Sequence, residues 1–260
     1  MLDTNSLDYI ACQQGTDKST RSDLPPTSDG YDGRPKQGHG YTVFYEHYLS
    51  SLRPKSLRLL EIGVLDGKSL MTWKAYFPQA QLFGLDIDPA CSRFEDDRTR
   101  IFVGSQADVQ LLAHIGEQVP GGFDIIIDDG SHYVAHVIAS FNGLFNYLKP
   151  GGIYVIEDLH IAAWADWGSV AFNRGMDLQR EEQGNDIRKM SRFLASVRDR
   201  SDVADLAVYL KKICFICKVS RNRTEEHYPW QRGDPLEELF PPKGRKSLLR
   251  NIAIRLLGPC

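Results

Sequence analysis

Two short segments of this 260-residue chain carry carboxylates in pairs. They are residues 128–132 (DDGSH) and residues 157–158 (ED), and each follows a short apolar run. Because neighbouring carboxylates repel one another and an unpaired buried charge is costly, four acids gathered at one place favour a bound cation. Hard divalent ions such as Mg2+ take oxygen ligands and keep positions open for water or substrate. Acids that merely cap helices are the competing interpretation, and acid pairs in both segments make it the weaker one.

His132 closes the first of these segments, three residues beyond Asp129. A neutral imidazole here could accept a proton from a hydroxyl group whose pKa a bound metal lowers. The deprotonated oxygen could then attack an activated methyl group. A single histidine is more often structural, but its place in a Gly-Ser turn beside the acids favours a catalytic role.

Two earlier turns have the character of a nucleoside site. Glu61 and Gly63 end an apolar run, and a glycine there lets the backbone approach a ligand closely, although any tight turn could use one. Asp86 ends a second apolar run about 25 residues further on, where an acid commonly binds ribose hydroxyls. A helix cap or turn acid is the alternative for Asp86, and the two turns together favour the ligand.

The elements that must position these residues alternate regularly. We expect buried strands at 57–63, 81–87, 100–104, 123–127 and 152–156, and helices at 41–52, 68–77, 108–119 and 133–148. This rhythm predicts an α/β fold, a doubly wound and mostly parallel sheet with helices on both faces. Ligands bind such sheets at the carboxyl ends of the strands, where the strand order reverses.

The regions outside this alternation are less regular. Residues 1–40 are polar and turn-rich, with a loop or lid at 22–40, and we expect a further helix at 184–200 and a last strand or strand pair within 206–219. We therefore predict an N-terminal lid and helical segment (1–52), a catalytic domain (53–220) and a C-terminal tail with a basic amphipathic helix (221–260).

The five cysteines are few and scattered, which argues against a disulfide framework. Cys214 and Cys217 have the spacing of half a zinc site or a redox pair. Because they lie in an apolar, β-rich run and no second pair completes a zinc set, we interpret both as strand side chains.

Composition limits the partners. A formal net charge of −3 argues against a nucleic-acid partner, and the absence of a leader or a long apolar run predicts a cytoplasmic protein. The basic, amphipathic run 243–257 could contact an anionic membrane peripherally, dock on another element or join a homo-oligomer. A plain surface or interface helix is the favoured interpretation.

The motifs LLEIG, GLDID, FDIIIDDGSH and LKPGGIYVIEDL, in this order, resemble the class I S-adenosylmethionine-dependent methyltransferases. More closely, the chain resembles the metal-dependent sugar O-methyltransferases of macrolide biosynthesis, of the mycinamicin and macrocin type. Residues 15–18 (GTDK) and 39–46 (HGYTVFYE) also resemble that group. The resemblance covers roughly residues 9–165.

The resemblance implies roles for particular residues. Asp129, Glu157 and Asp158 would bind Mg2+, and His132 would be the general base. The S-adenosylmethionine pocket would use six further residues, with Gln106 and Asp108 near the adenine and Tyr41 closing over the cofactor: Tyr41, Glu61, Gly63, Asp86, Gln106 and Asp108.

The chain is thus predicted to methylate a hydroxyl group on a sugar of a glycosylated metabolite, a glycolipid or a surface glycan. The acceptor is a small molecule or a glycan. Three alternatives stay open: a catechol-like acceptor, for which Trp164 and Trp167 could line a slot, a hydroxylase-type relative of the same fold, and a binding module that keeps the pocket as a relic.

Overall fold

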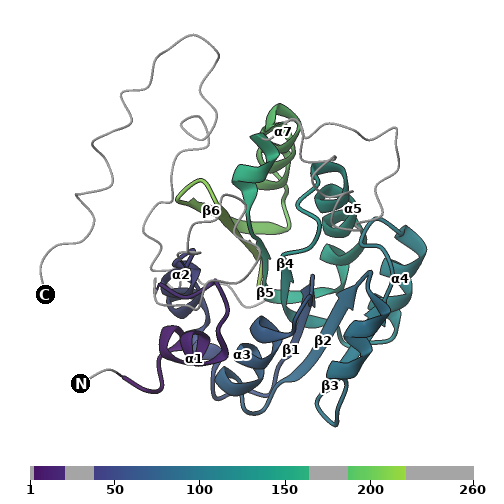
Figure 1. Ribbon diagram of the computed structural model, residues 1–260. Coiled ribbons are helices and arrows are strands. Elements are labelled where there is room, and N and C mark those ends of the chain that lie inside the picture. The colour runs from purple at the N-terminus through teal and green to yellow at the C-terminus, as the bar shows by residue number, and fades with distance from the viewer. Residues whose placement is uncertain (1–2, 21–37, 164–186, 221–260) are drawn as a thin grey trace, which may run out of the picture.

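The chain folds around one seven-stranded sheet (Figure 1). The computed structural model describes residues 3–20, 38–163 and 187–220. Within these ranges the strands are β1 (Arg58–Ile62), β2 (Gln81–Asp86), β3 (Thr99–Val103), β4 (Phe123–Asp128), β5 (Leu148–Ile156), β6 (Val203–Tyr209) and β7 (Ile213–Lys218).

The strand order is β3-β2-β1-β4-β5-β7-β6. The first five strands are parallel, and β7 and β6 add an antiparallel pair at one edge. The chain runs outward from β1 to β3 and then returns to place β4 on the other side of β1. The point where the order reverses therefore lies between β1 and β4, and the sheet is expected to bind a ligand at their carboxyl ends.

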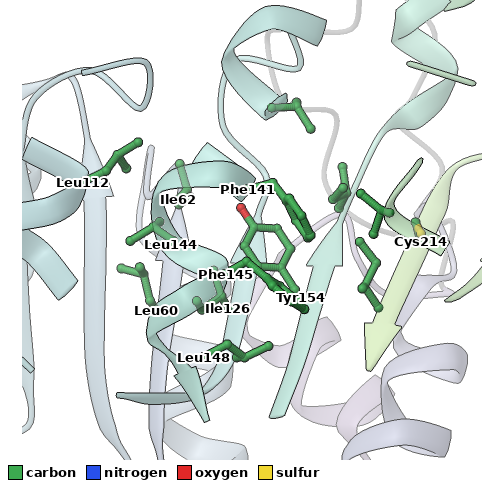
Figure 2. Close-up of a cluster of buried hydrophobic side chains, with 14 of the residues drawn as sticks. Leu60, Ile62, Leu112, Ile126, Phe141, Leu144, Phe145, Leu148, Tyr154 and Cys214 are labelled. Atoms are coloured by element: carbon green, nitrogen blue, oxygen red, sulfur yellow. The ribbon is translucent and has the colours of Figure 1, made fainter. Parts of the chain in front are cut away.

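Helices cover both faces of the sheet, as the alternation of strands and helices predicted. They are α1 (Leu7–Gln14), α2 (Tyr41–Leu49), α3 (Lys68–Tyr76), α4 (Val109–Glu117), α5 (Val134–Leu144) and α7 (Ile187–Arg198), with single 3-10 turns at Ser50–Leu52, Pro89–Phe94, Phe145–Tyr147 and Leu159–Ala163. One buried cluster joins the sheet to α4, α5 and α7, with Phe141, Phe145 and Tyr154 among its large side chains (Figure 2). A second cluster joins the opposite face to α1, α2 and α3. The doubly wound fold is confirmed.

Cys214 and Cys217 both lie on β7, and they face opposite sides of the sheet. Cys214 belongs to the first buried cluster and Cys217 to the second. Side chains three residues apart on a strand point in opposite directions, because the pleat has a period of two. The pair therefore cannot share a metal ion, and its interpretation as strand side chains is confirmed.

Three elements differ from the sequence-based prediction. Helix α1 lies in the N-terminal region where no element was predicted; its eight residues begin after Ser6, whose side chain accepts a hydrogen bond from the Tyr9 backbone N–H, and end at Gly15 in a left-handed conformation. Strand β5 begins four residues earlier than expected, because Leu148 already pairs with Phe123 before a shift in register. The helix expected to reach Leu148 consequently ends at Leu144 and passes into a 3-10 turn.

Several predicted features lie outside the described residues: most of the loop at 22–40, Trp164 and Trp167, and the basic tail. Among the residues that are described, no helix has both the length and the apolar character needed to cross a bilayer.

Candidate functional site

The predicted metal acids meet at the carboxyl ends of two parallel strands. Asp129 directly follows β4, and Glu157 and Asp158 directly follow β5. Asp128 pairs with Ile156 at the ends of these strands, and the backbone N–H of Glu157 donates to the carbonyl of Asp128 at 3.0 Å. The pairing of β4 with β5 therefore brings together acids that are almost thirty residues apart in the sequence.

Asp129, His132 and Asp158 form a set with metal-ligand geometry. One ligand atom from each lies within 4.8 Å of the others. The Nε2 atom of His132 is 4.0 Å from Oδ1 of Asp129 and 3.8 Å from Oδ2 of Asp158. Both His132 (φ 55°) and Asp158 (φ 53°) adopt the left-handed conformation, which is uncommon for residues other than glycine. Two carboxylates and an imidazole thus face a common point.

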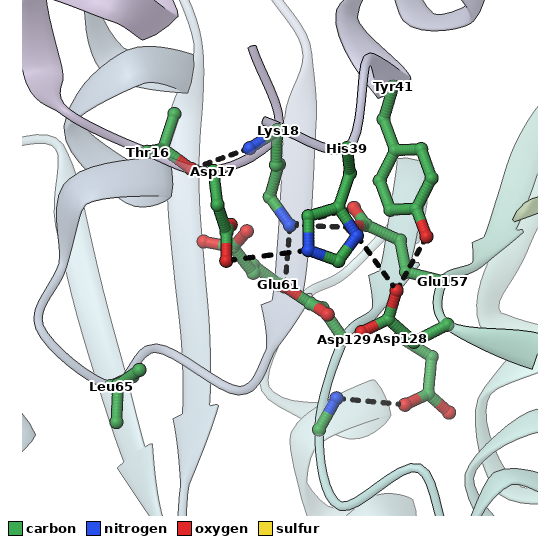
Figure 3. A network of polar contacts seen from close by, with 12 residues as sticks. Thr16, Asp17, Lys18, His39, Tyr41, Glu61, Leu65, Asp128, Asp129 and Glu157 are labelled. Atoms are coloured by element: carbon green, nitrogen blue, oxygen red, sulfur yellow. Dashed lines mark hydrogen bonds and ion pairs between the residues drawn. The ribbon is translucent and has the colours of Figure 1, made fainter. Parts of the chain in front are cut away.

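Glu157 lies deeper and faces a lysine. The Nζ atom of Lys18 is 2.8 Å from both carboxylate oxygens of Glu157 and 2.5 Å from Oδ2 of Asp129 (Figure 3). The Lys18 and Glu157 side chains are 3% and 2% exposed, whereas that of Asp129 is 24% exposed. Asp129 therefore connects a buried ion pair on one side with the more open His132 and Asp158 on the other.

Helix α2 holds two of the acids through tyrosines one turn apart. The hydroxyl of Tyr41 donates to Oδ1 of Asp158, and that of Tyr45 donates to Oε1 of Glu157, both at 2.5 Å. Nδ1 of His39, just before the helix, is 3.4 Å from the same Asp158 oxygen. Tyr41 was predicted to close over the cofactor; the structure places its hydroxyl on a predicted metal ligand.

These contacts determine how the acids and their partners titrate. Burial opposes the charge on Lys18, but the carboxylates of Asp129 and Glu157 outweigh it and raise the pKa of the ammonium well above its usual value. Burial also opposes ionisation of Asp158, yet the hydrogen bond from His39 and the nearby His132 hold the pKa of this carboxyl well below its usual range. The surroundings therefore favour the charged form of both Lys18 and Asp158.

Sequence reasoning gave Lys18, His39 and Tyr45 no role. They lie in the segments 15–18 and 39–46, which resemble the macrolide enzymes and in which only Tyr41 was predicted to have a role. Nothing in the local sequence shows that a polar N-terminal segment reaches acids more than a hundred residues away. Only that shared motif could have drawn attention to them.

The predicted cofactor residues lie along the carboxyl edge of β1, β2 and β3. Gly63 follows β1 with φ +88°, and a Cβ atom there would lie 2.2 Å from the backbone oxygen of Asp129. The position thus requires glycine, since the turn after β1 packs directly against the turn after β4. Glu61 is fully buried on β1, and its Oε1 accepts a hydrogen bond from Nε1 of Trp73 at 3.0 Å. Burial raises the pKa of Glu61 to about 7.

Asp86, at the end of β2, organises the turn after β1. Its Oδ2 accepts hydrogen bonds from the backbone N–H groups of Val64 (2.7 Å) and Leu65 (2.9 Å). Asp86 is half-buried, and Leu65 beside it is 78% exposed. A surface with one carboxylate and one apolar side chain is therefore accessible here, which suits a nucleoside.

Gln106 and Asp108 follow β3 and make contacts within the protein. Gln106 is buried; its Nε2 donates to Oδ1 of Asp128 at 3.0 Å, and its Oε1 accepts from the Ser131 backbone N–H at 2.6 Å. It thereby braces the turn that carries the acids and His132. Asp108 caps α4 by accepting from the backbone N–H groups of Gln110 and Leu111. Whether either residue also approaches an adenine stays a prediction.

The chain is similar to known proteins in both sequence and structure. Residues 60–159 match the family model described as a methyltransferase domain. The chain is 41% identical over 177 residues to mycinamicin VI 2''-O-methyltransferase from Micromonospora griseorubida, and 38% identical over 175 residues to demethylmacrocin O-methyltransferase from Streptomyces fradiae. Each match covers 62% of this chain and 44% of the relative, so the chain spans less than half the length of these relatives.

Among solved structures, the fold is similar to the MycE methyltransferase of the mycinamycin biosynthetic pathway, in complex with Mg, SAH and mycinamycin VI. The TM-score is 0.63 at 30% sequence identity, and the match covers 86% of this chain and 57% of that one. The doubly wound sheet, the motif order and these matches agree. Residues 60–159 therefore form a methyltransferase domain, and the chain resembles the macrolide sugar O-methyltransferases.

Proposed function

We propose that this chain methylates a hydroxyl group on a sugar of a glycosylated small molecule, with S-adenosylmethionine as methyl donor and a divalent ion such as Mg2+ in the site. The observation that carries the proposal is the meeting of Asp129 and Asp158 beside His132: one oxygen of each acid and a ring nitrogen of His132 lie within 4.8 Å of one another, so the acids can hold an ion with the imidazole next to it. The names of the two curated relatives, both O-methyltransferases of macrolides, support the class of acceptor.

The donor set suits a hard divalent ion. Asp129 and Asp158 each direct one oxygen toward His132, and Glu157 lies behind Asp129 as a third acid. Carboxylate oxygens are the ligands that Mg2+ prefers, and it is usually held by few protein groups so that water or substrate oxygens complete its coordination. Asp129, Glu157 and Asp158 are the proposed ligands.

The cofactor would lie along the turns after β1 and β2. Gly63 draws the first turn against Asp129, and Asp86 ties down the backbone of the same turn while staying half-buried. Asp86 is the group proposed to bind the ribose hydroxyls, and exposed Leu65 offers apolar surface beside it. The methyl donor would thus lie next to the acids, because the turns after β1 and β4 touch.

When bound, the ion supplies a Lewis acid that lowers the pKa of the acceptor hydroxyl, and S-adenosylmethionine supplies the methyl group. The residues of the chain hold and deprotonate the acceptor. Nε2 of His132 lies within 4.0 Å of an oxygen of both acids, so it can take the hydroxyl proton. The fixed positions of Asp129 and Asp158, anchored by Lys18 and Tyr41, then orient the acceptor oxygen.

The proposal is tested by incubating the purified protein with S-adenosylmethionine and a panel of glycosylated macrolides, simple glycosides and catechols, with and without EDTA. We expect methyl transfer to a sugar hydroxyl that EDTA abolishes and added Mg2+ restores, together with Mg2+ binding in calorimetry. Activity that chelation leaves unchanged would contradict the metal role. Exclusive methylation of catechols would favour the catechol alternative, and failure to bind S-adenosylmethionine would favour a binding module.

A further inference from the structure

The ammonium group of Lys18 contacts two of the three proposed metal ligands, as Figure 3 shows. We propose that Lys18 stays in place when a divalent ion binds, as a built-in cation that positions Asp129 and Glu157 for that ion. The inference rests on the proposed function, since it concerns the same site. It assigns Lys18 as a positioning residue that acts through the acids.

The division of oxygen atoms supports coexistence of the two cations. Asp129 directs Oδ2 to Lys18 and Oδ1 toward His132. Asp158 is arranged in the same way, with Oδ1 bound by the Tyr41 hydroxyl and Oδ2 toward His132. Asp129 and Asp158 are therefore each anchored by one oxygen and present the other, whereas Lys18 contacts both oxygens of Glu157. An incoming ion at the presented oxygens does not have to displace Lys18.

The backbone around Lys18 opposes its withdrawal. The carbonyl of Lys18 accepts a hydrogen bond from the Thr42 backbone N–H at 3.0 Å, which lies in the first turn of α2. Its neighbours are tied in the same way: the Asp17 carbonyl accepts from His39 N–H, and the Ser19 carbonyl from Gly40 N–H. The segment that carries Lys18 is therefore fixed against the start of α2, and the Lys18 side chain is only 3% exposed.

The charges of the three acids and of Lys18 also support the presence of both cations at the site. Asp129, Glu157 and Asp158 carry three negative charges when ionised, and the Lys18 ammonium leaves two. A divalent ion neutralises that remainder. Without Lys18, the deeply buried Glu157 would lose its counter-ion, and an unpaired buried charge is costly. Asp129 would lose the contact that fixes its orientation.

The competing possibility is that Lys18 merely occupies the metal position and leaves when the ion arrives. The two ideas predict opposite signs. If Lys18 is a positioning residue, its removal weakens metal binding. If Lys18 is a competitor for the same oxygens, its removal strengthens metal binding.

The test is calorimetric titration of Mg2+ into the metal-free protein, without S-adenosylmethionine or acceptor. We expect Lys18→Met to raise the Kd for Mg2+ about ten-fold, by the loss of one charge-assisted hydrogen bond to Asp129. Lys18→Arg should recover part of the affinity. Lys74→Met is the matched control, because it removes a lysine paired with Asp96 on the surface and should leave the Kd unchanged.

An unchanged or tighter Kd in Lys18→Met would overturn the inference. Should that variant not fold, as judged by its thermal melt, Lys18→Arg carries the test: its bulkier, planar group fits the three oxygens less well, so a Kd raised about three-fold is expected and an equal or lower Kd contradicts the idea. Wild-type protein that binds no Mg2+ at all would instead contradict the proposed function. Failure of the inference and failure of the function are therefore distinguishable.

Discussion

His132 adopts the left-handed backbone conformation, and so does Asp158, the acid it faces. Left-handed residues other than glycine cost roughly 1 kcal/mol or more each and persist only where the surroundings enforce them. Such positions gather at functional sites. The strained backbone at both residues is consistent with side chains that are aimed at a common point for chemistry.

Replacement of His132 by alanine should slow methyl transfer strongly. A general base typically contributes a factor of about 10² to 10⁴, so we expect the kcat of His132→Ala to fall by that factor in a methyl-transfer assay. His114→Ala is a suitable control, because His114 is exposed at the end of α4. Turnover within about three-fold of wild type would remove His132 from the role of base.

Glu61 should make the stability of the protein depend on pH. Burial raises its pKa from an ordinary 4.5 to about 7 in the folded protein. The folded state thus holds the proton more tightly than the unfolded state, so this carboxyl lowers stability as pH rises from about 4.5 to about 7, by roughly 3 kcal/mol in all. Glutamine stays neutral and can still accept the hydrogen bond from Trp73.

We therefore expect Glu61→Gln to gain stability over wild type as pH rises. The measurement is urea unfolding of both metal-free proteins at pH 4.5 and pH 8. Their difference in free energy of unfolding should grow toward roughly 3 kcal/mol at the higher pH. A difference independent of pH would show that Glu61 does not titrate in this range.

At the scale of single residues, the sequence predicted which residues lie together better than it predicted the contacts they make. It placed Asp129, Asp158 and His132 together, because each follows a strand and neighbouring parallel strands end at the same edge. It associated Tyr41 with the cofactor, which stays a prediction, and did not predict that the Tyr41 hydroxyl binds Asp158. The direction of a side chain from a distant helix depends on tertiary packing, which local patterns do not contain.

At the scale of elements, the packing of the turn after β1 on the turn after β4 connects the cofactor side of the sheet to the acids. Gly63 makes that contact possible through its positive φ and its missing Cβ. Gly15, at the end of α1, shares the positive φ, but a Cβ there would meet its nearest atom at 3.8 Å, an ordinary contact. A substitution at Gly15 therefore carries only the energetic cost of a positive φ. A substitution at Gly63 carries that cost together with the cost of a steric clash.

Gly63→Ala should destabilise the protein by roughly 2–4 kcal/mol, because strain and backbone displacement combine. Gly15→Ala should cost only about 1–2 kcal/mol, for its conformation alone. Thermal or urea unfolding of both variants gives the comparison. Equal losses in the two variants would show that the turn after β1 can move away from Asp129 at no cost.

The strands and helices with a regular pattern of buried apolar residues were largely predictable. Strands β1, β2, β3 and β4 lie where apolar runs indicated, because a parallel strand is buried on both faces. Helix α1 was missed because its eight residues are too few for a clear period and only Leu7 and Ala11 are buried. The early start of β5 was missed because a run containing proline and two glycines normally indicates a turn.

At the scale of the whole molecule, the order of the elements predicted the fold and the location of the site. It did not predict that the N-terminal segment contributes to the site. Alternating strands and helices leave few alternatives to a doubly wound sheet, and the reversal of strand order then fixes where a ligand binds. Which side chains the N-terminal segment contributes to the site depends on where that segment packs against the folded sheet. No element of the central alternation carries that information.

The contacts of Lys18, His39, Tyr41 and Tyr45 with the acids have a consequence for engineering this enzyme class. The region matched by the methyltransferase model starts only at residue 60, so a chimera that transplanted that region alone would inherit the acids without their anchors. A successful graft has to bring residues 15–18 and 39–45 along with the strands. The acids and the side chains that hold them lie on separate segments of the chain.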